Sequence, residues 1–340
     1  MTKLKVLITG GAGFIGTNAA ARYICEGHEV TILDNLSRKG SETNMKWLKG
    51  IGEFEFLRAN VEDKSLLQTF FQKHTFDLIF HLAAQVAVTS SVIDPVNDFS
   101  VNAYGTLLIL DAIRQTSPDA IFIYSSTNKV YGSLKDIELY EEQTCYRYAQ
   151  RYRKGITEDQ PLDFHSPYGC SKGCGDQYVR DYARIYGMKT VVMRQSCIYG
   201  PHQFGIVDQG WVAWIISRAI SGQPITVFGS GKQVRDVLHI KDLLDVYDCV
   251  VKDIEIAKGK IYNIGGGPEN KISVLELIGL SEMMMQNSVK YTFSDERPGD
   301  QRIYVSDISK VYQELGWKPC IRLQNGIQEL FDWIKESGSC

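Results

Sequence analysis

The sequence predicts an α/β fold in which a doubly wound parallel sheet is followed by a smaller α+β region. Short, near-continuous apolar runs alternate with amphipathic stretches up to about residue 194, which is typical of parallel strands covered on both faces. Right-handed crossovers between such strands produce a doubly wound sheet. Beyond residue 194, glycine and proline become frequent and short strands mix with helices, so a second region is expected there.

The elements of the first region follow one another in regular order. Strands are expected at 4–10, 29–34, 54–60, 77–84, 120–126 and 190–196. The intervening helices are expected at 14–26, 63–74, 98–116 and 168–187.

The second region is expected to close over the mouth of the sheet. Its strands are predicted at 224–229, 260–266 and 289–293, and its helices at 209–221, 240–252, 273–285 and 322–337. Because the helix at 240–252 could pack back on the sheet, residues 235–262 are assigned to the first domain together with residues 1–193. The second domain then comprises 194–234 and 263–340.

Composition narrows the class of protein. The net charge is −3 over 340 residues, so no basic field indicates nucleic acid or anionic membrane as a partner. No apolar run reaches the length of a membrane span, and no secretory signal is recognised. The eight scattered cysteines suit a reducing compartment, so a cytoplasmic location is expected. Cys170 and Cys174 have i, i+4 spacing but no nearby His or Cys partners, and no metal is expected.

Three glycines after the first strand form a dinucleotide-binding fingerprint. In ITGGAGFIG, Gly10, Gly13 and Gly16 stand between a strand and a helix, which indicates a Rossmann-type sheet. Such glycines allow close backbone approach to a pyrophosphate, whose charge meets the helix N-terminus. Asp34 ends the second strand, where a carboxylate accepts hydrogen bonds from an adenosine ribose and repels a 2′-phosphate. NAD is therefore favoured over NADP, although Arg38 argues the other way.

Two further strand ends are expected to meet the cofactor. Asn60 and Val61 follow the third strand and are expected near the adenine. HLAAQ (81–85) supplies small residues and then Gln85, where the nicotinamide half should lie. His81 is expected to be a buried histidine with satisfied hydrogen bonds and not a catalytic group.

The predicted reactive group consists of Thr127, Tyr168 and Lys172. Tyr168 and Lys172 are four residues apart, so they project from one face of a helix. A nearby ammonium and a positive nicotinamide ring both favour the phenolate, so the pKa of Tyr168 is expected to be lowered. Thr127 ends its strand in the crevice where open α/β sheets bind ligands, and its hydroxyl can share a substrate hydroxyl with Tyr168. The group is suited to removing a proton while hydride leaves carbon.

With these residues in place, the chain resembles the extended short-chain dehydrogenase/reductase family of nucleotide-sugar enzymes. The resemblance extends over essentially the whole chain and rests on GGAGFIG, HLAAQ, VNAYGT, SSTNKVYG, SPYGCSK, IYGP, GKQVRDVLHIKD, YNIGGG and RPGDQR. It implies a nucleotide-diphosphate sugar as substrate. It also implies that Arg235 and Arg297 grip the diphosphate, which suits bidentate guanidinium groups; surface ion pairing is the alternative.

The expected site residues are as follows. The cofactor-binding residues are Gly10, Gly13, Phe14, Ile15, Gly16, Asp34, Asn35, Ser37, Arg38, Asn60, Val61, Leu82, Ala83, Ala84, Gln85, Asn102, Ser125, Tyr168 and Lys172. The substrate-binding residues are Gln85, Thr127, Asn128, Lys129, Ser196, Gln209, Gly210, Trp211, Arg235, Arg297 and Asp300. Trp214, three residues after Trp211, is expected to belong to the core.

The two residues after Thr127 bear on which reaction follows oxidation. Family members that eliminate water have Asp–Glu there as acid and base, whereas this chain has Asn128–Lys129. An amide cannot act as a general acid, and an ammonium is not a base at neutral pH. The pair therefore favours an epimerase that oxidises a carbinol to a ketone and reduces it from the other face, with NAD retained.

Several stretches resemble the CDP-tyvelose (CDP-paratose) 2-epimerases in particular. They are DNLSRKG, YSSTNKVYG, LDFHSPYGCSKG, DQYVRDYARIYG and DQGWVAW. The resemblance implies inversion at C2 of a CDP-hexose and a role in lipopolysaccharide O-antigen biosynthesis. Cys197 stands where 4-epimerases have an Asn that is assigned to the sugar diphosphate, which agrees with a different sugar pose.

Other functions remain open at this point. A UDP-sugar 4-epimerase would share every reactive residue and differ in the carbon inverted. A 4,6-dehydratase is disfavoured by Asn128–Lys129. A non-catalytic NAD-binding regulator would be expected to lack Thr127, Tyr168 or Lys172, and all three are present.

Two surfaces complete the expectations. Residues 133–164 are rich in Tyr, Arg and acids, and form a long connection that could cover the substrate, meet a neighbouring subunit or be a solvated loop. Family members pair the helices at 98–116 and 168–187 between subunits, so a homodimer or homotetramer is expected.

Overall fold

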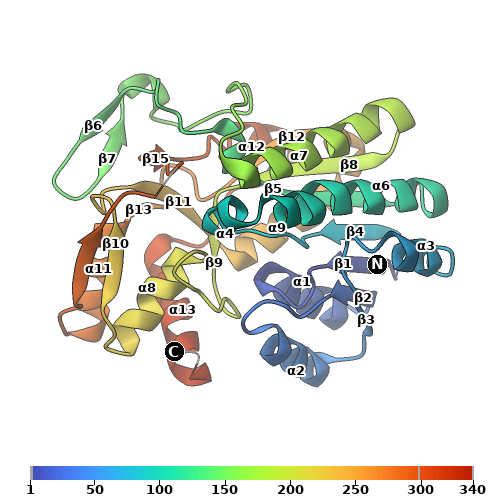
Figure 1. The fold of residues 1–340 in the computed structure, drawn as a ribbon, viewed down its shortest axis with the longest axis horizontal. Helices are drawn as coiled ribbons and strands as arrows, with labels where there is room; N and C mark the ends of the chain where they lie inside the picture. Colours follow the sequence, from blue (N-terminus) through green and yellow to red (C-terminus); the bar gives the residue numbers. More distant parts are fainter. Residues whose placement is uncertain (1–2, 298, 339–340) are drawn as a thin grey trace.

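The protein contains the parallel sheet that the sequence predicts (Figure 1). In this computed structural model, which describes residues 3–297 and 299–338, seven strands follow the order β12-β8-β5-β4-β1-β2-β3. All six pairings in this sheet are parallel. The strands are β1 Lys5–Thr9, β2 Glu29–Asp34, β3 Glu55–Arg58, β4 Leu78–His81, β5 Ile121–Thr127, β8 Lys189–Gln195 and β12 Ile261–Ile264. The predicted fold class is therefore confirmed.

Both faces of this sheet are covered by helices because successive strand residues are apolar. In β1, Val6 and Ile8 face one core while Leu7 faces the other, and all three are fully buried. The first core is closed by α1 Phe14–Cys25, α2 Ser41–Ile51, α9 Ile240–Lys252 and α12 Ser309–Leu315. The second is closed by α3 Lys64–Phe71, α6 Gly105–Thr116 and α7 Ser166–Tyr186.

Some elements differ from the prediction. The helix expected at 98–116 begins inside α5 (Pro95–Phe99), passes through a π-helical turn at Ser100–Tyr104 and continues as α6. Helix α2 was not predicted, and α4 (Val88–Ile93) precedes α5. Strand β12 crosses the proposed domain limit at residue 262, and α9 packs on α1, as suggested for the helix at 240–252. The domain limits themselves stay a prediction.

The C-terminal elements lie on one side of the main sheet, at the left in Figure 1. Strand β11 (Val234–His239) pairs with β13 (Lys271–Ser273), β15 (Ile303–Tyr304) and β9 (Cys197–Tyr199). Strands β10 (Ile225–Phe228) and β14 (Tyr291–Ser294) form a separate parallel pair. Helices α8 (Trp211–Ile220), α11 (Val274–Met285) and α13 (Leu323–Ser337) enclose a third core with these strands. The remaining helix is α10 (Ile254–Ala257).

The segment 133–164 is ordered and docked on the C-terminal elements. It contains the antiparallel hairpin β6 (Leu139–Glu141) and β7 (Tyr146–Tyr148), visible at the upper left of Figure 1. The amide of Tyr146 donates to the carbonyl of Lys232 over 3.0 Å, and the Tyr148 hydroxyl donates to the carbonyl of Ile303 over 3.1 Å. A freely solvated loop is therefore excluded for this part of the segment.

Two general expectations can be compared with the described residues. No helix in 3–297 or 299–338 is long and apolar enough to cross a membrane. The seven cysteines in these ranges are all free, and no group of three or more metal-ligating side chains occurs in them.

Candidate active site

A cavity of about 880 Å³ lies where the carboxyl ends of the sheet strands meet the C-terminal elements. Its wall contains residues that follow β1, β2, β4, β5 and β8 and others from the β9–α8 connection. Every residue expected to bind cofactor or substrate lines this cavity, with the exception of Asn102. Asn102 is buried behind the wall, where it exchanges two hydrogen bonds with the backbone of Gln85.

The glycine turn packs tightly against neighbouring backbone, so Gly10 and Gly16 have no space for side chains. A Cβ on Gly16 would lie 2.2 Å from the carbonyl oxygen of Gly10, and one on Gly10 would lie 2.7 Å from the amide nitrogen of Ala83. Gly10 also adopts φ +70°, a left-handed conformation that side chains disfavour. The turn therefore fits close backbone approach by a dinucleotide.

The carboxylate of Asp34 is held at the end of β2 by backbone amides. Its oxygens accept from Ala12 N at 3.0 Å and from Leu36 N at 2.7 Å. Burial raises its pKa, while the two amide hydrogen bonds oppose that rise. Nearby, the Asn35 amide donates to Asn60 Oδ1 over 2.8 Å. This corner therefore presents polar groups that suit an adenosine ribose.

Arg38 extends into the same cavity with an unused donor. Its Nη2 is buried and makes no hydrogen bond within the described part of the chain. Burial lowers its pKa, and the fields of Tyr168 and Asp34 oppose this effect. A buried guanidinium with a free donor suits an anionic ligand. Arg38 is therefore a candidate contact for the negatively charged dinucleotide.

Thr127, Tyr168 and Lys172 come together at the end of β5. Thr127 lies close enough to Tyr168 to lower the pKa of the Tyr168 hydroxyl. Lys172 donates from Nζ to the carbonyl of Ser125 over 2.5 Å, and its Nζ lies 4.2 Å from the centre of the Tyr124 ring. All three side chains of the proposed acid–base group line the cavity.

Burial dominates the electrostatics of this group. Burial raises the pKa of Tyr168 to about 12, and Thr127 and the charge of Arg38 only partly oppose it. Burial also lowers the pKa of Lys172 to about 7, while Asp176 and Asp98 oppose this change. In the protein by itself the pKa of Tyr168 is raised, because burial outweighs the effects of Thr127 and Arg38. The expected lowering included a bound nicotinamide ring and stays a prediction.

The Asn128–Lys129 pair is fixed by the C-terminal elements. Asn128 donates from Nδ2 to Gln301 Oε1 over 3.0 Å. Lys129 Nζ lies 3.4 Å from Asp300 Oδ1, and the same oxygen accepts from Arg235 Nη2 at 2.6 Å. Burial alone would raise the pKa of Asp300, but the two cations hold it below its ordinary value. Asp300 is therefore an ionised counter-charge and a poor proton donor.

The two arginines expected at the diphosphate both face the cavity, and both have acidic partners. Arg297 Nη2 lies 3.1 Å from Asp208 Oδ1, and its guanidinium lies 3.9 Å from the centre of the Phe228 ring. Arg235 pairs with Asp300. Both arginines therefore form ion pairs, which was the alternative expectation. The pairs lie in the cavity wall, where a bound diphosphate would replace the carboxylate as the partner of each arginine.

The β9–α8 connection supplies the remaining wall. Trp211 donates from Nε1 to the Cys197 sulfur over 3.3 Å. Trp214 packs on the third core, as expected, and also lines the cavity. Ser196 uses its hydroxyl on the Asp236 backbone carbonyl and carboxylate, so it presents no free donor to a ligand.

Several residues of the wall were missed at the sequence level. Asp208, His202, Gln203 and Phe204 line the cavity but belong to a stretch without regular periodicity. Asp208 precedes the Gln209–Trp211 segment, so an acid beside a candidate nucleotide contact was the available signal. His81 behaves as expected, because its ring is hydrogen-bonded to Thr9 and Thr106 and burial lowers its pKa to about 3.

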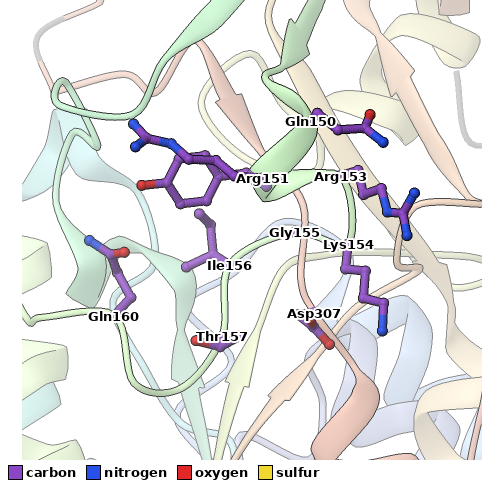
Figure 2. Close-up of a pocket in the computed structure, with 10 residues that line it drawn as sticks. Gln150, Arg151, Arg153, Lys154, Gly155, Ile156, Thr157, Gln160 and Asp307 are labelled. Carbon is purple, nitrogen blue, oxygen red and sulfur yellow. The ribbon is translucent and has the colours of Figure 1, made fainter.

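A second cavity of about 380 Å³ lies under residues 150–160 (Figure 2). Figure 2 shows Arg153 and Lys154 directed to one side and Arg151 to the other, over the Tyr152 ring. Their charges do not converge on one point. No residue of 133–164 lines the larger cavity among the described residues, so the expectation that this segment covers the substrate is not supported.

Comparison with known proteins agrees with this geometry. The family model of GDP-mannose 4,6 dehydratase matches residues 7–330. CDP-paratose 2-epimerase of Salmonella typhi is 43% identical over 335 residues, which cover 97% of this chain and 99% of that protein.

Two solved structures extend this similarity to the fold. UDP-glucose 4-epimerase of Thermotoga maritima with UDP-glucose superposes with a TM-score of 0.85 at 28% identity, covering 98% of this chain and 99% of that one. UDP-glucuronic acid 4-epimerase of Bacillus cereus, in complex with UDP-glucuronic acid and NAD, has a TM-score of 0.83 at 26% identity, with coverage of 98% and 99%.

Proposed function

The chain belongs to the extended short-chain dehydrogenase/reductase family of nucleotide-sugar epimerases and dehydratases, and we propose that it is an NAD-dependent epimerase that inverts C2 of a CDP-hexose. The reaction would be of the CDP-paratose to CDP-tyvelose type, which would make a building block of lipopolysaccharide O-antigen. The similarity to the Salmonella typhi enzyme over almost the full length of both chains supports this substrate class.

The main support for an epimerase, as opposed to a dehydratase, comes from the two residues that follow Thr127. Its neighbours Asn128 and Lys129 are an amide and an ammonium, held by Gln301 and Asp300. Elimination of water needs an acid and a base at the sugar, and neither side chain can serve as that pair. Asp300 is held ionised by its two cations and does not replace the missing acid. The site therefore supports oxidation and return without elimination.

The residues that would hold NAD are the glycine turn, Asp34 and Arg38, together with the ends of β3 and β4. The tight glycine backbone at Gly10 and Gly16 and the free donor of Arg38 fit that cofactor. When bound, NAD supplies the chemistry of taking a hydride from a sugar carbon and giving it back.

The chain's own groups handle the proton. The Tyr168 and Thr127 side chains would bind the hydroxyl of the reacting sugar carbon, and the Tyr168 phenolate oxygen would accept its proton. Lys172, tied to the Ser125 carbonyl, would stabilise that phenolate as an ammonium ion. Because burial raises the pKa of Tyr168, a further positive charge beside it is needed for a base at neutral pH, and a cationic nicotinamide ring meets that need.

The substrate diphosphate would lie against Arg235 and Arg297. Both guanidinium groups already face acidic side chains in the cavity, and guanidinium groups bind phosphate as well as carboxylate in bidentate geometry. The cytosine would lie near Gln209 and Trp211, where the β9–α8 connection closes the cavity.

A homodimer or homotetramer is proposed from the outer surface of α5 and α7. Both helices carry exposed apolar side chains, including Val96, Phe99, Tyr178, Ile185 and Tyr186. Large exposed apolar surface often marks a protein interface. A cytoplasmic location agrees with the free cysteines.

A UDP-sugar 4-epimerase is the second candidate. It is favoured by the similarity to the Thermotoga maritima enzyme, whose structure contains UDP-glucose. Asn128 and Lys129 do not separate the two epimerases, since neither reaction eliminates water.

The test is product analysis with purified protein and no added NAD. CDP-paratose, CDP-glucose and UDP-glucose are supplied separately, and proton NMR identifies the carbon that inverts. Inversion at C2 of a CDP-sugar is expected. Inversion at C4, or turnover of UDP-glucose alone, would overturn the proposal in favour of the 4-epimerase.

A further inference from the structure

Asp98 is a buried carboxylate beside the proposed catalytic residues, and no cation is paired with it. It lies in α5 with no exposed surface. Its oxygens accept from Gln85 Nε2 at 2.9 Å, from Asn102 Nδ2 at 3.2 Å and from the Ser171 hydroxyl. All three donors are neutral, and within the described residues no Lys, Arg or His lies within ion-pair distance of it. Burial raises the pKa of Asp98, and the hydrogen bonds from Ser171 and Gln85 and the charge of Lys172 oppose that rise. A carboxylate buried without a direct cationic partner calls for a physical reason.

The other carboxylate close to Lys172 is already neutralised. Asp176 receives two hydrogen bonds of 2.9 Å from the guanidinium of Arg194, which is itself buried. The Ser126 hydroxyl donates to it over 2.7 Å. Asp176 and Asp98 both raise the pKa of Lys172, but Asp176 has Arg194 as a direct ionic partner, whereas Asp98 has no cation in contact with it.

The hydrogen bonds of Asp98 connect two parts of the site. Ser171 lies between Tyr168 and Lys172 on α7, and its hydroxyl also contacts the Tyr168 carbonyl at 3.2 Å. Gln85 lines the cavity, and Asn102 is bonded to both its amide and its carbonyl. Through its hydrogen bonds to Gln85 and Ser171, Asp98 thus connects the segment after β4 with α7, the helix that carries Tyr168.

We propose that Asp98 is a positioning residue of the reaction, which fixes Ser171 and Gln85 around the site and supplies the negative charge that balances the Lys172 ammonium. The inference rests on the proposed function, because Lys172 matters as a cation only where Tyr168 acts as the base. Asp98 itself touches neither the cavity nor a reacting atom.

The groups that face Lys172 determine the expected direction of change. They are Asp176 on α7, Tyr124 and the Ser125 carbonyl on β5, His81 on β4 and Asp98 on α5. His81 is neutral at working pH because burial lowers its pKa to about 3. Burial also lowers the pKa of Lys172 to about 7, and Asp98 opposes that change, so removal of its charge should lower the pKa further. Asp98 also raises the pKa of Tyr168, and this value should fall as well.

The test is the titration of Lys172 in Asp98→Asn, followed by carbon-13 NMR of protein labelled at the lysine Cε. The Lys172 signal is identified as the one absent from Lys172→Met. In Asp98→Asn its midpoint should move down by about one pH unit. Asp94→Asn is the matched control, since it lies on the same short helix but is exposed, and asparagine preserves its capping role. Its midpoint should equal that of the wild type.

Two further variants separate charge from shape. Asp98→Glu restores the charge and should return the midpoint toward the wild-type value. Ser171→Ala removes one hydrogen bond but keeps the charge, so it should slow turnover without moving the midpoint. Should Asp98→Asn fail to fold, Asp98→Ser gives a smaller neutral replacement with the same expected shift.

The outcomes distinguish this inference from the proposed function. A folded Asp98→Asn or Asp98→Ser protein with an unchanged Lys172 midpoint would overturn the role of Asp98, whatever the substrate. A shifted midpoint supports it even if CDP-sugars are not turned over. With turnover, the bell-shaped pH profile of kcat should move to lower pH in Asp98→Asn, and above the midpoint the rate should fall about tenfold.

Discussion

The ammonium of Lys172 donates a hydrogen bond over 2.5 Å to the backbone carbonyl of Ser125, two residues before Thr127. This bond joins α7, which carries Tyr168 and Lys172, to the end of β5, which carries Thr127. A second hydrogen bond joins the same two elements, since the Ser126 hydroxyl donates to Asp176 of α7. The relative position of the three reactive side chains therefore depends on one helix–strand junction, and its parts can be tested separately.

Removing the Tyr168 hydroxyl should abolish most of the chemistry and leave the fold intact. Tyr168→Phe keeps the buried ring but loses the group that accepts the proton. The rate should fall by about 10²- to 10⁴-fold, which is the usual contribution of one acid–base residue. Tyr178→Phe is the matched control, because Tyr178 lies on the same helix with its ring exposed. Equal rates for Tyr168→Phe and the wild type would disprove the assignment.

Lys172→Met should change how the unfolding free energy depends on pH. Burial lowers the folded-state pKa of Lys172 to about 7, below its ordinary value of 10.5. Between these values the unfolded chain binds more protons, so wild-type stability should rise with pH by up to about 1.4 kcal/mol per unit relative to the variant. Below pH 7 the folded protein carries the full destabilisation from a buried, protonated Lys172.

Urea unfolding at several pH values between 7 and 9 measures this effect. Lys135→Met, at an exposed lysine, should give a stability curve parallel to that of the wild type. Parallel curves for Lys172→Met would mean that Lys172 has no lowered pKa in the folded protein.

The buried ion pair between Arg194 and Asp176 should be important for stability. Arg194→Met leaves Asp176 charged and unpaired in a fully buried position, which typically costs about 3–5 kcal/mol. Arg114→Met breaks an exposed pair with Asp111, and solvent screening makes that pair weak. Chemical denaturation should show a large loss for the first variant and little for the second. Similar losses for both would contradict the burial argument.

Lys129→Met should weaken substrate binding more than catalysis. Lys129 shares Asp300 with Arg235 in the cavity wall, so its loss removes a cation from the proposed diphosphate end. KM is expected to rise about tenfold or more, as for loss of a charged hydrogen bond, with kcat nearly unchanged. Lys135→Met should keep both constants. If kcat falls while KM stays constant, Lys129 belongs to the chemical step instead.

Gly16→Ala should prevent retention of NAD. Its Cβ would lie 2.2 Å from the Gly10 carbonyl oxygen and 2.6 Å from the Gly11 Cα, and neither backbone atom can move without opening the turn. The nucleotide released by denaturing purified protein is expected to fall below detection. Gly50→Ala, in α2 with no atom near the added Cβ, should retain the wild-type amount. Normal NAD content in Gly16→Ala would argue against the glycine turn as the cofactor site.

Local patterns in the sequence predicted the sheet and the wall of the site. Apolar runs such as that of β1 indicate a strand buried on both faces. The spacing of Gly10, Gly13 and Gly16 indicates a dinucleotide site because it stands between a strand and a helix. Thr127 was predicted from its position at the end of a strand, and Tyr168 from its helical spacing to Lys172. Neither prediction needs knowledge of contacts between distant segments.

Features that depend on contacts between distant segments escaped prediction. Asp98 meets Ser171 across 73 positions and Asn128 meets Gln301 across 173, and no local pattern encodes such pairs. Burial raises the pKa of Tyr168 in the protein by itself, and the i, i+4 spacing reveals the ammonium but not the extent of burial. The π-helical turn at 100–104 also lies against α7, a contact between segments far apart in the sequence.

The most direct test of the central claim uses CDP-paratose carrying deuterium at C2, in ordinary water, with purified protein and no added NAD. The account predicts that CDP-tyvelose forms and keeps its deuterium at C2, because the hydrogen removed from that carbon returns to it within the closed site. Replacement of the deuterium by hydrogen from water would indicate proton exchange at carbon and contradict the mechanism. Inversion at C4 with C2 unchanged would contradict the proposed reaction itself.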